Sequence, residues 1–179
     1  MARISPLLAA ELTELPCPYC GRRLPVGTEW LGAAEAQWGS CGVKLTQDDD
    51  VVAVLALAPA ARADEAMVKM IWVRPEFVRH GYGRQLVQAA SAESLRHKLT
   101  AIRASGGQGR LVCAMPPVGF LREVGFTLPD HERLWLLDLR KTVLQRTSLR
   151  LLERLFGGLG GNPEPAGGAI SSRVEGFRG

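Results

Sequence analysis

Long apolar runs are absent from this chain of 179 residues, and cysteines and histidines are few, four and three in number. The longest apolar candidate, residues 51–58, is too short for a helix that crosses a bilayer. The first ten residues hold too brief an apolar stretch for a secretory signal peptide. We therefore predict a cytoplasmic protein without a transmembrane segment, whose cysteines are reduced or bound to metal.

Aromatic residues are also scarce, at 6% of the chain, and no basic stripe runs between them. Because nucleic-acid-binding domains gather basic residues on one face, we expect no nucleic-acid partner. The net charge is +4, and the excess is local. Residues 71–110 hold seven Arg and Lys against Glu76 and Glu93, which predicts an anionic ligand in that region.

Apolar patterning predicts alternating strands and helices after a largely irregular start. Five strands are expected, at residues 42–46, 51–58, 67–73, 99–104 and 133–139. Four helices are expected, at residues 7–12, 31–38, 81–97 and 116–124. A polar turn at residues 47–50 joins the first two strands into a hairpin.

The junction between the strand at residues 67–73 and the helix at residues 81–97 is the most informative feature. Gly81 and Gly83 let the backbone approach a ligand closely and turn successive N–H groups outward. The helix N-terminus adds partial positive charge at the same place. Arg79, His80 and Arg84 surround it with side-chain donors. This corner is suited to holding phosphate.

Cysteines in the first forty residues suggest a second kind of site. Cys17 and Cys20 have the spacing of half a zinc knuckle, and Cys41 could supply a third thiolate. No second Cys-x-x-Cys exists, so a fourth ligand would come from Cys113, a histidine or water. The other interpretation is that these residues are small buried hydrophobes or a free thiol pair. Zinc binding through Cys17, Cys20 and Cys41 stays open beside it.

The C-terminal part divides into a helix and a tail. Residues 142–156 place leucines on one face and charged residues on the other, which predicts an amphipathic helix. Its packing against the domain, or against a second subunit in a homodimer, is favoured over an anionic membrane surface. Residues 157–179 are rich in Gly, Pro and Ser and are predicted to be disordered.

Three segments in order carry a family resemblance: residues 73–77 (VRPEF), 79–86 (RHGYGRQL) and 120–126 (FLREVGF). Over residues 41–141 the chain resembles the GNAT (N-acetyltransferase) superfamily, and residues 1–40 resemble the cysteine-bearing N-terminal segment of a little-characterised bacterial subgroup. The resemblance implies an α/β (α+β) fold with a mixed, mostly antiparallel central sheet flanked by helices. It also implies that residues 1–40 pack on that core.

The function that this resemblance implies is acyl-CoA-dependent N-acyltransfer, with acetyl-CoA as cosubstrate and an amine-bearing acceptor. The pyrophosphate would rest on the glycine loop, and the pantetheine arm would pair with the strand before it. An N–H of that strand would polarise the acyl carbonyl. The residues implied to bind the cofactor are Ile71, Trp72, Val73, Arg79, His80, Gly81, Tyr82, Gly83 and Arg84.

Catalytic residues are not assigned by the resemblance. Val78 stands where the family pattern has Arg or Gln, and Phe120 stands where many members have a Tyr that protonates the leaving thiolate. The candidates for proton transfer are Glu65, Glu76, His80 and Cys113. Two alternatives follow: a non-catalytic acyl-CoA-binding regulatory module, and a metal- or redox-sensing interaction protein that acts through the cysteine segment.

Overall fold

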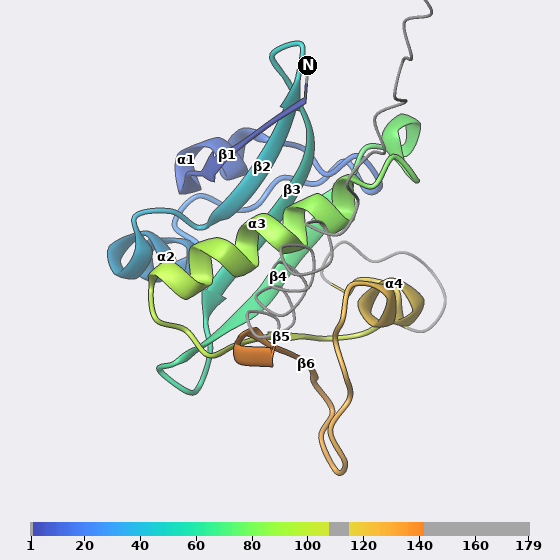
Figure 1. Ribbon diagram of the computed structural model, residues 1–179. Coiled ribbons are helices and arrows are strands. Elements are labelled where there is room, and N and C mark those ends of the chain that lie inside the picture. Colours follow the sequence, from blue (N-terminus) through green and yellow to red (C-terminus); the bar gives the residue numbers. More distant parts are fainter. Residues whose placement is uncertain (1, 108–114, 142–179) are drawn as a thin grey trace, which may run out of the picture. The chain divides into compact units, whose positions relative to one another are not determined.

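The computed structural model describes residues 2–107 and 115–141, which form a sheet of six strands in chain order (Figure 1). The strands are β1 (Ala2–Leu7), β2 (Gly42–Gln47), β3 (Asp50–Pro59), β4 (Glu65–Val73), β5 (Ala101–Ala104) and β6 (Trp135–Asp138). Neighbouring strands are antiparallel except β4 and β5, which are parallel. The predicted mixed, mostly antiparallel sheet is confirmed.

Helices cover both faces of this sheet. They are α1 (Ala9–Glu14), α2 (Glu29–Trp38), the short 3₁₀ helix η1 (Pro75–Phe77), α3 (Tyr82–Arg96) and α4 (Val118–Glu123). In Figure 1, α3 lies across the strands on one face. Within the described ranges no helix has the length and apolar character that a membrane span needs.

Each face has its own core. On the first, Leu86 of α3 and Leu121 of α4 pack with Leu45 of β2, and all three are at most 1% exposed. Burial of a leucine at this level stabilises the fold by about 1.5–3 kcal/mol. On the second face, Leu12 of α1 and Leu31 of α2 pack in a cluster that also holds Trp72 and Cys41. Alternation of side chains along β3 supplies both cores.

Strand β4 is paired on both edges only near its start. Residues Glu65–Met67 pair with Ala101–Arg103 of β5, and β5 ends at Ala104. Further along β4, Ala56 of β3 faces Met70 while Leu57 faces Val68, so Lys69 is the extra residue of a β-bulge. Beyond the bulge, the described residues provide β4 with a partner on the β3 side alone.

The expected irregular start was wrong. Ala2–Leu7 forms the edge strand β1, and the helix expected at residues 7–12 begins at Ala9. Pro6 argued against a strand in the sequence, because proline has no N–H to donate to a sheet. At an edge strand the missing donor can face solvent, so no hydrogen bond of the sheet is lost. The other expected elements are present with shifted ends. The helix at residues 142–156 and the tail at residues 157–179 lie outside the described residues.

Candidate functional site

A cavity of about 520 Å³ opens beside the unpaired part of β4. Its walls come from the end of β4, the loop before α3, the first turn of α3, and α4 with the prolines before it. Of the nine residues expected to bind a cofactor, eight line this cavity: Ile71, Trp72, Val73, Arg79, Gly81, Tyr82, Gly83 and Arg84. The structure thus brings together two segments that the sequence predicted to act together.

The backbone of β4 turns hydrogen-bonding groups toward this cavity. The N–H of Arg74 donates to the carbonyl of Val52 at 2.8 Å, which places these two residues at a hydrogen-bonded position of the β3–β4 ladder. Pairs alternate in an antiparallel ladder, so the next residue, Val73, points its N–H and C=O to the opposite edge. Ile71 does the same two residues earlier. The free edge of β4 therefore presents donors and acceptors at Ile71 and Val73.

The opposite wall is the N-terminus of α3. Gly81 is the N-cap in the left-handed region, with φ of 79°, and Arg79 has φ of 69°. The first turn of a helix leaves its amide N–H groups without intrahelical partners. The side chains of Arg79 and Arg84 are exposed beside these amides. Backbone donors, helix polarity and two cations make this corner suitable for an anion.

His80 departs from the expected set. Its ring does not line the cavity; Nδ1 lies 3.2 Å from the carbonyl of Val78, and the ring packs near those of Phe77 and Tyr82. The Tyr82 hydroxyl donates to Oε1 of Gln47 at 2.8 Å, which ties the start of α3 to the β2–β3 hairpin. These contacts give the corner a rigid support.

Gly83 is small for a reason that the sequence did not reveal. A Cβ built there would lie 2.9 Å from Cε2 of Phe120 on α4, closer than real Cβ atoms approach. A Cβ on Gly81 meets nothing within 4 Å, so that glycine is needed for its backbone angle. Gly81 thus shapes the anion corner, while Gly83 allows α3 and α4 to meet over the cavity.

Tyr19 and Glu123 are cavity residues that sequence reasoning missed. The Tyr19 hydroxyl donates to the carbonyl of Val73 at 2.6 Å, across 54 positions of sequence. Among the lining residues that the structure describes, Glu123 is the one carboxylate. Glu123 is the last residue of α4, and no pattern in the sequence marks it as a cavity residue.

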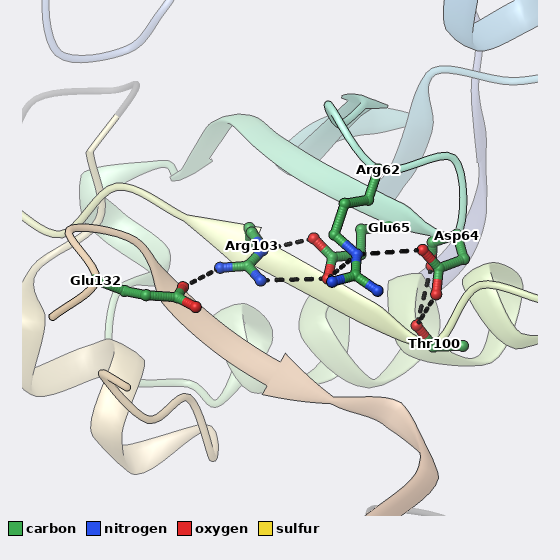
Figure 2. A network of polar contacts seen from close by, with 6 residues as sticks. All are labelled: Arg62, Asp64, Glu65, Thr100, Arg103 and Glu132. Atoms are coloured by element: carbon green, nitrogen blue, oxygen red, sulfur yellow. Dashed lines mark hydrogen bonds and ion pairs between the residues drawn. The ribbon is translucent and has the colours of Figure 1, made fainter. Parts of the chain in front are cut away.

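Glu65 is removed from the candidates for proton transfer. Figure 2 shows it held by Arg103, whose Nε and Nη2 lie 2.5 and 3.2 Å from the two carboxylate oxygens. Arg62 lies 3.4 Å away on the same carboxylate, and Arg103 also bonds Glu132. The hydrogen bonds to Glu65 and Glu132 hold the pKa of Arg103 above its usual value. This cluster lies where β4 and β5 are paired, away from the free edge.

The remaining candidates stay predictions. Glu76 lies exposed in η1 and His80 in the loop after it, and neither lines the cavity. Cys113 lies outside the described residues. The general base and the general acid are therefore not assigned by position.

The expected zinc site is not supported. Within residues 2–107 and 115–141, no three His, Cys, Asp or Glu side chains are grouped to hold a metal ion. Cys41 is fully buried, its thiol donates to the carbonyl of Leu7 at 3.3 Å, and burial together with the nearby Glu35 raises its pKa to about 12. A thiol that stays protonated is a poor ligand for zinc. Cys17 is buried with Cys41 in the second core, as the alternative interpretation expected.

Comparison with known proteins supplies independent evidence. A sequence model of the acetyltransferase (GNAT) family matches residues 9–110, more than half of the chain. No curated protein matches the chain.

Solved structures resemble the fold at low sequence identity. An acetyltransferase of the GNAT family from Staphylococcus aureus Mu50 is 14% identical, with a TM-score of 0.57 over 78% of this chain and 99% of that one. The ribosomal-protein-S18-alanine N-acetyltransferase from Escherichia coli is 16% identical, with a TM-score of 0.52 over 78% and 94%. Ard1 from Thermoplasma volcanium is 14% identical, with a TM-score of 0.53 over 75% and 94%. At these identities the likeness is one of fold.

Proposed function

Because this chain belongs to the GNAT acetyltransferase family, we propose that it transfers an acyl group from acyl-CoA, with acetyl as the simplest case, to an amine. One observation carries the proposal: the free edge of β4 and the N-terminus of α3 line the same cavity of about 520 Å³. Acyl-CoA has an arm with amide groups and a charged pyrophosphate, and these two walls complement them in turn.

The free edge of β4 is suited to the pantetheine arm. The N–H and C=O groups of Ile71 and Val73 lie about 6.6 Å apart along the strand, at the usual rise of an extended chain. An amide-bearing arm laid along this edge adds to the sheet as a further strand would. The aromatic rings of Phe77, Tyr82 and Phe120 close the cavity around it.

The N-terminus of α3 is suited to the pyrophosphate. Amide groups after Gly81 and the guanidinium groups of Arg79 and Arg84 supply donors there. With the phosphates at this corner and the arm on β4, the thioester reaches the edge near Ile71. An N–H of that edge then polarises the acyl carbonyl and stabilises the oxyanion that forms.

Transfer proceeds by direct attack of the amine on the thioester carbon. The C–N bond forms, the tetrahedral intermediate collapses, the C–S bond breaks and its electron pair leaves on sulfur. The amine proton passes to water or to Glu123, the described carboxylate of the lining. Phe120 has no proton to give, so the CoA thiolate takes its proton from solvent.

A second candidate function is supported by Phe120 as well. Its ring packs on Gly83 and lines the cavity without an ionisable group, as a module that binds acyl-CoA and does not turn it over would allow. The acceptor, a homodimer and a cytoplasmic location stay predictions.

Two measurements test these functions. Calorimetric titration with acetyl-CoA is expected to give saturable heat, and the ligand is expected to raise the unfolding temperature by mass action. Absence of binding at millimolar acetyl-CoA would contradict both functions. Release of free CoA thiol is then followed with peptide α-amines, lysine, polyamines and small amines. Release with one class supports the transferase, and binding without release from any class supports the module.

A further inference from the structure

The Cys-Pro-Tyr-Cys sequence at residues 17–20 forms a turn that carries Tyr19 to the cavity. The N–H of Gly21 donates to the carbonyl of Cys17 at 2.8 Å, and the N–H of Cys17 donates to the carbonyl of Arg22 at 2.9 Å. Cys17 is 3% exposed and packs in the same core cluster as Trp72 of β4. The base of this turn is therefore fixed against β4.

Tyr19 forms a hydrogen bond with a backbone carbonyl that the proposed cofactor would also bind. Its hydroxyl donates to the Val73 carbonyl at 2.6 Å, and its side chain lines the cavity. This carbonyl is the acceptor that Val73 presents on the free edge of β4. An amide N–H of a pantetheine arm on that edge would seek the same oxygen, at the place where the Tyr19 ring lies.

The side chain of Tyr19 is partly exposed to solvent, at 38%, on a turn whose buried anchor is Cys17. Rotation toward solvent would expose one phenol and release one carbonyl without opening either core. Displacement of Tyr19 would exchange its hydrogen bond to the Val73 carbonyl for one to water.

We propose that Tyr19 is a displaceable latch on the cofactor-binding edge of β4, closed on the carbonyl of Val73 when acyl-CoA is absent. This inference rests on the proposed function, since it names a residue that regulates that site. With the latch closed for part of the time, the apparent affinity for acyl-CoA is reduced by the fraction of open molecules. Tyr19 thereby couples the N-terminal segment to occupancy of the cavity.

The test compares wild-type protein with Tyr19→Phe and Tyr19→Leu, both of which lack the hydroxyl. Two probes are titrated: CoA, which carries the arm, and adenosine 3′,5′-bisphosphate, which lacks it. Loss of one competing hydrogen bond is expected to tighten CoA binding about two- to tenfold. The association rate should rise in proportion, because binding no longer waits for Tyr19 to leave. Binding of the bisphosphate should not change, since it never reaches Val73.

Controls separate the latch from a general effect on the fold. Val26, 90% exposed in the same N-terminal segment, is changed to Ala, and this variant is expected to match wild type with both probes. The unfolding temperature is measured for every variant. Equal or weaker CoA binding by Tyr19→Phe and Tyr19→Leu would overturn the latch, as would parallel changes in both probes. If wild type binds neither probe, the proposed function itself fails, and the latch with it.

Discussion

The two ends of β4 differ in what their edges meet: one end pairs with strands on both sides, and the other lines a cavity. At its start, residues Glu65–Met67 have strands on both sides, and the buried Glu65 is bonded to Arg103 (Figure 2). At its end, Ile71 and Val73 turn backbone groups to a cavity, and the exposed side chains of Arg79 and Arg84 line the same cavity. One strand thus has an end whose charged groups are paired within the protein and an end that lines a cavity.

This difference shows that a charged side chain indicates a binding site only when its charge is not already paired with another side chain. Glu65 and Arg103 are bonded to one another, so neither buried charge is left without a partner, and removal of one of them is expected to destabilise the protein. Arg79 and Arg84 stand exposed beside a helix N-terminus, where a cation is unfavourable unless an anion joins it. Breaking the first end should therefore change stability, and breaking the second should change binding.

The largest effect is expected from Arg103→Met. Removal of the guanidinium leaves the carboxylate of Glu65, 6% exposed, without its bidentate partner. Removal of one partner of a buried ion pair costs about 3–5 kcal/mol, and the exposed Arg62, 3.4 Å from Glu65, is expected to offset only part of it. Urea denaturation measures the loss, while the Kd for acetyl-CoA of the folded protein should be unchanged.

Glu132→Gln is the matched control for that change. It removes the more exposed partner of Arg103 and leaves the pair with Glu65 in place, so its expected cost is below about 1 kcal/mol. The double variant Glu65→Met/Arg103→Met should regain most of the stability, since apolar groups can replace a buried pair. Equal costs for Arg103→Met and Glu132→Gln would show that the pair with Glu65 has no special role.

The next largest effect is expected from Gly83→Leu, which changes the cavity beside the end of β4. The new side chain meets the ring of Phe120, which must shift within the cavity. Overpacking of this kind costs about 1–3 kcal/mol, and here we expect it as lost affinity for acetyl-CoA. Titration measures it. Phe120→Ala in the same chain makes room and should restore part of the affinity; if it does not, Gly83 serves the ligand directly.

The end of β4 that lines the cavity could be predicted from the sequence, whereas the ion pair at its start could not. Gly81 and Gly83 between a strand and a helix are a local signal, and a cavity wall follows from it. Glu65 and Arg103 are 38 positions apart in the sequence, and no local sequence pattern predicts their contact. The position of Tyr19 in the cavity was not predicted for the same reason, since its contact with Val73 spans 54 positions of sequence. The spacing of Cys17 and Cys20 favoured a metal site in the sequence interpretation, whereas Cys17 packs in the second core and Cys20 is exposed.

Arg84→Gln and Arg96→Gln form a mirror pair on one helix. Arg84 lies in the first turn of α3, where its charge opposes the helix dipole, and Arg96 lies in the last turn, where its charge agrees with it. Arg84→Gln should raise stability by about 0.3–1 kcal/mol yet weaken acetyl-CoA binding a few-fold, and less so at high salt. Arg96→Gln should lower stability and leave binding unchanged. Weaker binding by both variants alike would point to net charge alone.

The smallest effect is expected at the start of β4, from Thr100→Val. The Thr100 hydroxyl donates to Oδ2 of Asp64 at 2.7 Å and, as the largest cause, lowers the pKa of that carboxyl (Figure 2). A carboxyl whose pKa is lowered on folding stabilises the folded state at pH values above its pKa in the unfolded chain. This contribution is lost as the pH falls through the pKa of the folded state. Valine keeps the shape of threonine and removes the donor, so the pKa of Asp64 should rise toward its ordinary value. Carboxyl NMR titration reads this directly, and urea midpoints at about pH 6 and about pH 3 should then show a smaller acid loss than in wild type. An unchanged Asp64 titration would mean that the backbone and Arg62, rather than the Thr100 hydroxyl, hold that carboxylate where β4 begins.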